Sequence, residues 1–204
     1  MHEHRRRLLA LLGTAGATTL AGCGFFDDGD TTAEVPKLTP EDGDSRDVFG
    51  ASVGVSSDGT TAVIGAPFDE DPNGEAAGSA YVFQQEDGAW SEETKLAPED
   101  GDSVDEFGFS VAVSSDGTTA VIGARFDGDP NGANAGSAYV FHQEDGAWSE
   151  EAKLAPDDGA GGNLFGASVG VSSDGTTAVI GADNDQYQTG EPEAGSAYVF
   201  PLEE

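Results

Sequence analysis

The fold is decided by a stretch that begins Phe49-Gly50-Ala51-Ser52-Val53 and continues Ser57-Asp58-Gly59-Thr60-Thr61-Ala62-Val63-Ile64-Gly65-Ala66. Its opening Phe-Gly pair returns at Phe107 and at Phe165, so the spacing is the same both times. Each copy closes on Gly-Ser-Ala-Tyr-Val-Phe, at residues 78–83, 136–141 and 195–200. A constant period of this kind indicates a repeat architecture, in which every copy folds as the same small unit.

Within one copy the residue pattern predicts four short β-strands. In the second copy these are Phe107–Val113, Thr118–Ala124, Ser137–His142 and Ala147–Leu154. They are rich in β-branched and aromatic residues, and Asp-Gly turns join the first to the second and the third to the fourth, which is a strong hairpin signal. No stretch beyond the N-terminal segment has helical periodicity. Four antiparallel strands per copy are the blade of a β-propeller, so we expect an all-β propeller.

Residues that recur once per copy have an expected place in such a blade. The innermost strand must be slim, and Gly50–Gly54 suits it, whereas Trp90 and Trp148 suit the wide outer rim. Repeated aromatic residues are more typical of a packed core than of a sugar-binding platform. We interpret the repeated tyrosines as core residues: Tyr81, Tyr139 and Tyr198.

Three signals together resemble the FG-GAP repeat: the opening Phe-Gly, a Gly-Ala after the second strand, and the Gly-Ser-Ala-Tyr-Val-Phe strand. Gly65-Ala66-Pro67 matches fully, whereas Gly123-Ala124-Arg125 and Gly181-Ala182-Asp183 lack the proline. The resemblance covers about residues 35–204. FG-GAP repeats form the blades of the integrin α-chain head and of many prokaryotic surface proteins. The resemblance therefore implies a propeller of roughly seven blades that binds partners without catalysis.

The N-terminal segment 1–34 is interpreted as an export signal and a tether. Residues 1–22 hold a basic start, Arg5–Arg7, and a short apolar stretch, and they resemble a twin-arginine signal peptide. Leu20-Ala21-Gly22-Cys23 resembles the lipobox of prokaryotic lipoproteins, so we expect a lipid on Cys23 that anchors the chain to the outer face of the cell membrane. An incidental cysteine in a plain signal peptide is the alternative. Residues 23–34 would then form an acidic tether.

The blade count suggests that one chain is not a whole ring. We expect three blades at about residues 49–106, 107–164 and 165–204, with a further N-terminal strand at 35–38. Lys37-Leu38 aligns with Lys95-Leu96 and Lys153-Leu154, so this strand has the register of a fourth strand, which the third copy lacks. Propellers have four to eight blades. We therefore expect a homodimer that closes six blades by exchanging this strand. A piece of a longer array, or an arc docked on another protein, is the alternative.

The charge of the chain limits its partners. Of 204 residues, 39 are acidic and only 8 are Lys or Arg, a formal net charge of −31. Nucleic acids and anionic lipid surfaces are polyanions and would be repelled. We interpret the charge as adaptation to molar salt, because the Debye length is only about 3 Å at 1 M and surface carboxylates then repel each other little.

The loop after the second strand is a candidate calcium site. FG-GAP blades often bind calcium in the loop between strands one and two. In this sequence the loop between strands one and two carries one carboxylate, too few for six to eight oxygen ligands. The loop between strands two and three begins like a calcium loop, Asp-x-Asp-x-Asn-Gly, but lacks the closing glutamate. Acidic solvated turns are the alternative. The candidate metal ligands are Asp69, Asp71 and Asn73, Asp127, Asp129 and Asn131, and Asp183 and Asp185.

Catalytic signals are weak. Gly50–Gly54 matches the Gly-x-Ser-x-Gly nucleophile motif, but that motif needs a strand-to-helix turn and a histidine partner. His142 is the only histidine after the signal segment and is expected to be a surface strand residue. Tyr187 breaks the repeat in the third loop and is a candidate ligand-binding aromatic. We expect a non-catalytic, lipid-anchored surface module that binds a protein or glycan. A glycan-cleaving enzyme and a passive surface-coat component are the alternatives.

Overall fold

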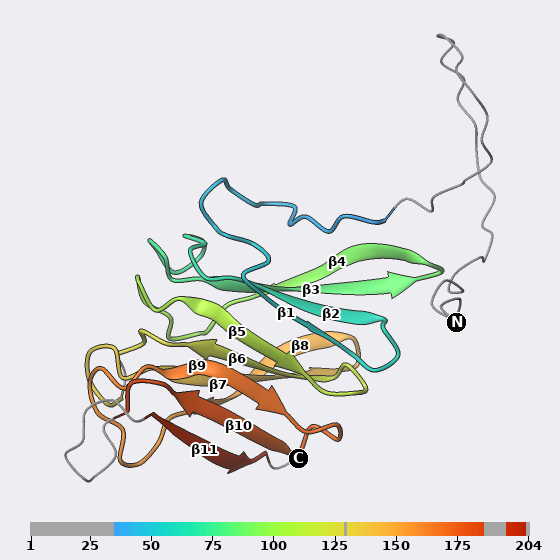
Figure 1. Ribbon diagram of the computed structural model, residues 1–204. Coiled ribbons are helices and arrows are strands. Elements are labelled where there is room, and N and C mark those ends of the chain that lie inside the picture. The colour runs from blue at the N-terminus through green and yellow to red at the C-terminus, as the bar shows by residue number, and fades with distance from the viewer. Residues whose placement is uncertain (1–34, 129, 186–194, 203–204) are drawn as a thin grey trace, which may run out of the picture. The chain divides into compact units, whose positions relative to one another are not determined.

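The computed structural model describes residues 35–128, 130–185 and 195–202. Figure 1 shows β1–β4 at the top and β9–β11 toward the bottom, with β5 and β6 between them. No helix occurs among these residues, and so none that is long and apolar enough to cross a membrane. The strands are β1 (Ser52–Val55), β2 (Thr61–Ala66), β3 (Ser79–Glu86), β4 (Ala89–Leu96), β5 (Phe107–Val113), β6 (Thr119–Ala124), β7 (Ser137–Glu144), β8 (Ala147–Leu154), β9 (Phe165–Val171), β10 (Thr177–Ala182) and β11 (Ser196–Pro201).

The strands form three antiparallel sheets, which we call blades 1, 2 and 3. Blade 1 has the order β1-β2-β3-β4 and blade 2 the order β5-β6-β7-β8, while blade 3 has β9-β10-β11. The predicted all-β fold of propeller blades is confirmed. The expected N-terminal strand at 35–38 is not a strand in the single chain. A strand needs a hydrogen-bonded neighbour, and no described strand pairs with this segment.

Tight turns and long loops lie at opposite ends of each blade. The turn between β3 and β4 has a positive φ at both Asp87 (50°) and Gly88 (82°), as the left-handed turn of a two-residue hairpin requires. Because the strands are antiparallel, the loop after β2 (67–78) and the linker after β4 (97–106) both emerge from the other end. We call this end, where the long loops gather, the loop end (Figure 1).

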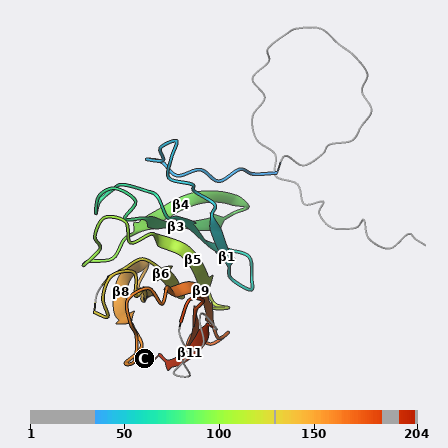
Figure 2. The same ribbon diagram turned by 60° about the vertical axis from the view of Figure 1, so that its left-hand side comes forward.

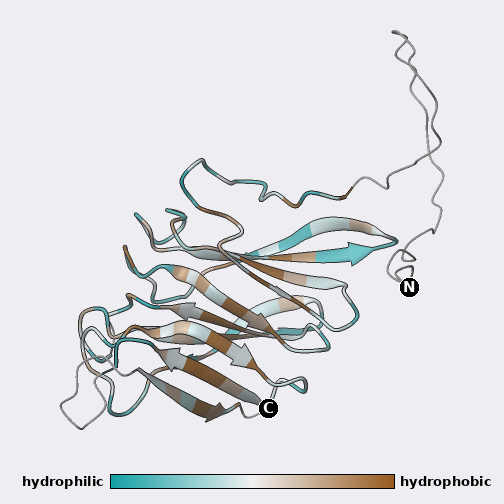
Figure 3. Ribbon diagram, in the orientation of Figure 1, coloured by the Kyte–Doolittle hydropathy of each residue, from teal (hydrophilic) through white to brown (hydrophobic). Residues whose placement is uncertain are grey.

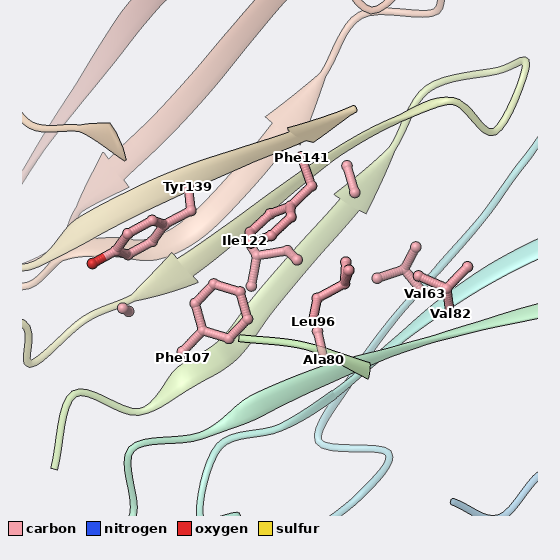
Figure 4. Packing of buried hydrophobic residues seen from close by; sticks show 10 residues of the cluster. Val63, Ala80, Val82, Leu96, Phe107, Ile122, Tyr139 and Phe141 are labelled. Atoms are coloured by element: carbon pink, nitrogen blue, oxygen red, sulfur yellow. The ribbon is translucent and has the colours of Figure 1, made fainter. Parts of the chain in front are cut away.

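The core lies between blades as well as within them. Val63 and Leu96 of blade 1 pack against Phe107, Ile122 and Phe141 of blade 2, and all five side chains are buried (Figure 4). Each Phe-Gly phenylalanine also packs edge-on against the tyrosine and phenylalanine of its own third strand, with ring centroids 5.5–5.9 Å apart. Tyr81 and Tyr139 are buried core residues, as predicted, whereas Tyr198 is partly buried and packs against the core. Figure 3 shows the apolar residues gathered on the strands.

The signature glycines are contacts between neighbouring blades. A Cβ on Gly65 would lie 1.9 Å from the carbonyl oxygen of Gly108, and one on Gly123 would lie 2.0 Å from that of Gly166. Ser52 Oγ donates to the Gly108 oxygen (2.8 Å), so the serine of the Gly-x-Ser-x-Gly pattern has a structural role. The Gly-Ala of one blade therefore receives the Phe-Gly of the next, which sets how closely blades approach. Figure 2 shows β1, β5 and β9 following one another.

Candidate functional site

Blade 1 holds a lysine between two carboxylates at the loop end. Lys95 Nζ on β4 lies 2.8 Å from Asp69 of the β2–β3 loop and 2.8 Å from Asp42 of the preceding linker. Tyr81 on β3 places its hydroxyl 2.7 Å from Asp69 and 2.8 Å from Asp42. Asp69 also accepts a bond from the Asp71 amide (3.0 Å). We call Asp42, Asp69, Tyr81 and Lys95 the first lysine cluster.

Blade 2 repeats the arrangement. Lys153 Nζ lies 2.7 Å from Asp100 and 2.8 Å from Asp127, and the Tyr139 hydroxyl lies 2.9 and 2.8 Å from the same two carboxylates. The side chain of Asp127 is 5 % exposed and that of Lys153 is 19 % exposed. We call Asp100, Asp127, Tyr139 and Lys153 the second lysine cluster. Each cluster joins two strands of one blade to a loop and to the segment that precedes the blade.

The electrostatics of these clusters fixes their ionisation. Burial alone would raise the pKa of Asp69, but hydrogen bonds from Lys95, the Asp71 amide and Tyr81 outweigh it and hold the pKa below its usual value. The pKa values of Asp42 and Asp100 are lowered in the same way. Burial and the two carboxylates push the Tyr81 pKa far above its ordinary range. Asp42, Asp69 and Asp100 are therefore ionised. The carboxylates of both clusters accept lysine and tyrosine donors, and these contacts hold the loops in place.

Blade 3 has the same cluster without a lysine. Tyr198 donates to Asp185 (2.8 Å), and burial, Asp185 and Asp158 raise the pKa of its hydroxyl. Among the described residues no lysine or arginine forms an ion pair with either carboxylate. Asn163 stands where blade 2 has Asp105 and donates 2.9 Å to Asp185. We call Asp158, Asp185 and Tyr198 the third cluster.

A like-charge contact distinguishes blade 2 from blade 3. Asp105 is buried, and its carboxylate accepts a bond from the Asp102 amide (2.7 Å). Burial, together with the charges of Asp127 and Asp102, raises the pKa of Asp105 to about 6. In blade 3 the Asn163 amide donates a hydrogen bond to Asp185, so the repulsion between two carboxylates is absent at this position.

The predicted calcium ligands are used in other ways where the structure describes them. Asp69 and Asp127 belong to the lysine clusters, whereas Asn73 and Asn131 donate to the Pro98 and Pro156 carbonyls, each at 2.9 Å. Asp185 belongs to the third cluster; Asp71 and Asp183 are exposed, and the Asp71 carbonyl accepts a bond from Ser79. No group of three carboxylate, histidine or cysteine side chains that could hold a metal occurs in the described part of the chain. The calcium site stays a prediction.

Other predicted site residues lie elsewhere. Cys23, Asp129 and Tyr187 lie outside the described residues, as do the export signal and the whole tether. His142 lies 3.3 Å from the Thr119 hydroxyl, in the place where Gln84 accepts from Thr61 in blade 1. It is thus a strand residue with a structural partner. A pocket of about 140 Å³ at the loop end of blade 1 is lined mainly by acidic side chains and Arg46.

The sequence interpretation missed the lysine clusters, although the signal was present. The chain contains three lysines, Lys37, Lys95 and Lys153, and their spacing equals the period of the repeat. Cations that are scarce in an acidic chain and recur with the repeat indicate a structural ion pair. Which carboxylates they meet could not be deduced, because Asp42 and Lys95 are 53 residues apart and meet only in the folded blade.

The repeat unit itself matches a known family in three places. The profile of the FG-GAP repeat matches residues 32–83, 90–141 and 148–200. The chain belongs to the FG-GAP repeat family. Each matched unit ends with the third strand of a blade, and the second and third begin within the fourth strand of the blade before. The FG-GAP unit is thus the fourth strand of one blade together with the first three of the next.

A sequence comparison with one curated protein agrees with this assignment. Integrin alpha-6 of Gallus gallus is 30 % identical over 131 residues, which cover 61 % of this chain but only 12 % of the integrin. Three solved structures share 12–17 % identity: hydrazine synthase of Kuenenia stuttgartiensis (TM-score 0.41, 65 % of this chain, 29 % of that chain), Sqt1 of Saccharomyces cerevisiae (0.45, 75 % and 36 %) and the periplasmic gluconolactonase of Pseudomonas aeruginosa (0.44, 70 % and 41 %). These structural likenesses carry no functional argument.

Proposed function

We propose that this FG-GAP protein is a non-catalytic binding module whose loop end holds a protein or glycan outside the cytoplasm. The observation that carries the proposal is the occupation of Asp69 and Asp127 by lysine and tyrosine donors. General acid–base catalysis needs a carboxylate or histidine that is free to exchange a proton with substrate. The same contacts instead hold the loops in fixed positions, which suits binding because less conformational entropy is lost.

The loop end also has the features of a continuous surface. Asn73 ties the β2–β3 loop of blade 1 to the linker that leads into blade 2, and Asn131 repeats the contact one blade later. Exposed carboxylates border it, among them Glu75 and Asp102. A ligand with a positively charged face is therefore favoured. We further propose that a lipid on Cys23 displays this surface on the outer face of the membrane.

The proposal is tested by capture from cell-envelope extract in molar salt. We expect specific capture by the native chain and loss of capture by the double variant Glu75→Lys and Asp102→Lys at the loop end. The matched control, Glu86→Lys with Glu144→Lys, makes the same charge change at the exposed turn end of β3 and β7 and should retain capture. Equal capture by both variants, or none by the native chain, would contradict the proposal and favour a passive coat component.

A further inference from the structure

Blade 3 exposes a strand edge and a face that blades 1 and 2 bury. In the described part of the chain β11 pairs only with β10, whereas β3 and β7 each have a fourth strand on the other side. Val199 is 67 % exposed and Val179 is 45 % exposed. Their counterparts Val82 and Val63 in blade 1 are 0 % exposed, because blade 2 covers them. Blade 3 therefore presents the apolar surface that receives a following blade.

Blade 1 exposes the complementary face. Val53 is 70 % exposed and Val55 is 61 % exposed. Their counterparts Val111 and Val113 are packed against the core between blades 1 and 2. The two ends of the arc thus expose the two sides of one kind of interface, the one that joins blades within the chain.

The N-terminal segment already lies as a fourth strand would. Leu38 packs against Ile64, Tyr81 and Phe83 of blade 1, as Leu96 packs against the equivalent residues of blade 2. Lys37, next to it, is exposed. Its counterparts Lys95 and Lys153 each sit between two aspartates, and the third cluster is the one that holds no lysine among the described residues.

We propose that the segment at Lys37–Leu38 of a second copy pairs with β11, so that its Lys37 enters the third cluster between Asp158 and Asp185. The register follows from the other blades, where Lys95 lies opposite Tyr81 and Leu96 opposite Ala80. Lys37 of the second copy lies opposite Tyr198, and Leu38 lies opposite Ala197. The exchange is reciprocal, so two chains close a ring of six blades. This inference is independent of the proposed ligand.

The occupant is a second copy rather than the same chain for a geometric reason. Blades 1 and 3 are separated by blade 2, so a chain that filled its own third cluster would close a ring of three blades. Known propellers have four to eight. A head-to-tail contact that closes on a two-fold axis uses both exposed faces of each chain and leaves no open edge.

The signature glycines also differ between blade 3 and the other two blades. Gly65 and Gly123 have the Phe-Gly backbone of the next blade within about 2 Å of a built Cβ, whereas Gly181 in blade 3 meets only its own Ser168 hydroxyl at that range. In the ring, Gly181 receives the Phe49-Gly50 backbone of the second copy. A methyl group at position 181 should therefore weaken the contact between two chains while changing the folding of a single chain little.

The first test is the molar mass of the full chain by light scattering in molar salt, with circular dichroism as the measure of folding. We expect twice the chain mass of 20.8 kDa. Lys37→Glu, which places a third carboxylate in the third cluster, and Gly181→Ala should each give a folded species of one chain mass. Arg46→Glu makes the same charge change at a side chain that is 82 % exposed and should leave the dimer intact. A monomeric native chain, or dimeric Lys37→Glu, would overturn the proposal.

The second test fixes the register and the partner. Two chains, both carrying Cys23→Ser, are mixed under oxidising conditions, one with Leu38→Cys and the other with Ala197→Cys. Directly opposed residues of antiparallel strands lie within disulfide range, so a covalent pair of one chain of each kind is expected. Leu38→Cys and Thr60→Cys form the control pair, which should not link. When both cysteines are on one chain, a linked monomer would show that the segment closes on itself and would sink the proposal.

Discussion

Lys95 and Lys153 acquire their role from where the repeat places them. Each is one of three lysines in a chain with 39 acidic residues, and each meets two carboxylates from different segments. A partly buried pair of aspartates would repel strongly without a cation, so the lysine makes the close approach of loop and linker possible. At the residue scale, these two lysines neutralise acidic side chains at positions that are partly shielded from water.

Asp105 is the residue at which the native chain is not optimised for neutral pH. Its pKa of about 6 in the folded chain exceeds the ordinary value of 3.8. The carboxyl therefore stabilises the folded state most below about pH 4, and this stabilisation is lost as pH rises through 6. We expect Asp105→Asn, which copies Asn163, to raise the free energy of unfolding at pH 7 by about 1–2 kcal/mol, and the gain to vanish near pH 4. Denaturant titrations at the two pH values measure it.

The matched control is Asp87→Asn in an exposed hairpin turn, where asparagine also accepts the positive φ. It should change stability by less than about 0.5 kcal/mol at either pH. A gain at Asp105 that is equal at pH 4 and pH 7 would show that titration of this carboxyl is not its cause.

At the scale of elements, the blade is held to its neighbour by backbone contact as much as by side chains. β2 and β6 carry the glycine that the next Phe-Gly pair meets, and the serine on the innermost strand bonds the same carbonyl: Ser52 to Gly108 and Ser110 to Gly166. The turns add a second tie, because the Ser57 amide donates to Ser115 and the Ser115 amide to Ser173. Neighbouring blades are thus fixed at both ends of the inner strands.

We expect Gly123→Ala to lower the free energy of unfolding by about 2–3 kcal/mol, because the new methyl would lie 2.0 Å from a backbone oxygen of blade 3, and blades 2 and 3 would have to separate. Gly128→Ala, whose nearest neighbours are 3.8 Å away, is the control and should cost less than about 0.5 kcal/mol. Thermal and denaturant unfolding of both variants measure the difference. Similar losses in the two variants would contradict the contact as the cause.

At the scale of the molecule, the net charge of −31 governs the conditions under which the fold persists. Most of the carboxylates have no cation within reach, since the chain has 8 basic residues. Their mutual repulsion destabilises the compact state unless salt screens it.

We therefore expect the melting temperature to rise steadily from millimolar to molar potassium chloride. Sodium sulfate at equal ionic strength is the comparison that separates screening from the general strengthening of apolar burial by sulfate. A melting temperature that does not depend on salt would remove the argument for salt adaptation.

The sequence predicted most of the fold because its signals are local. The strand expected at Phe107–Val113 has the observed bounds, and the strand expected at Thr118 begins at Thr119, since the Thr118 amide bonds the turn aspartate Asp116 instead. The third strand runs beyond the predicted His142, to Glu144, because the hairpin with β8 continues up to the Asp-Gly turn. The role of Asp69 and Asp127 was not predicted, since turn aspartates and ion-pair aspartates look alike along the chain.

By itself the sequence determined the repeat, the strands, the turns and the family, because alternation of apolar residues and turn chemistry act between residues close along the chain. Tertiary structure alone decided that Lys95 joins Asp42 to Asp69 and that the signature glycines are contacts between blades. It also decided which valines of blade 3 are exposed among the described residues. These features depend on how one sheet packs on the next, and packing brings together groups from distant parts of the chain whose separation in space no local pattern specifies.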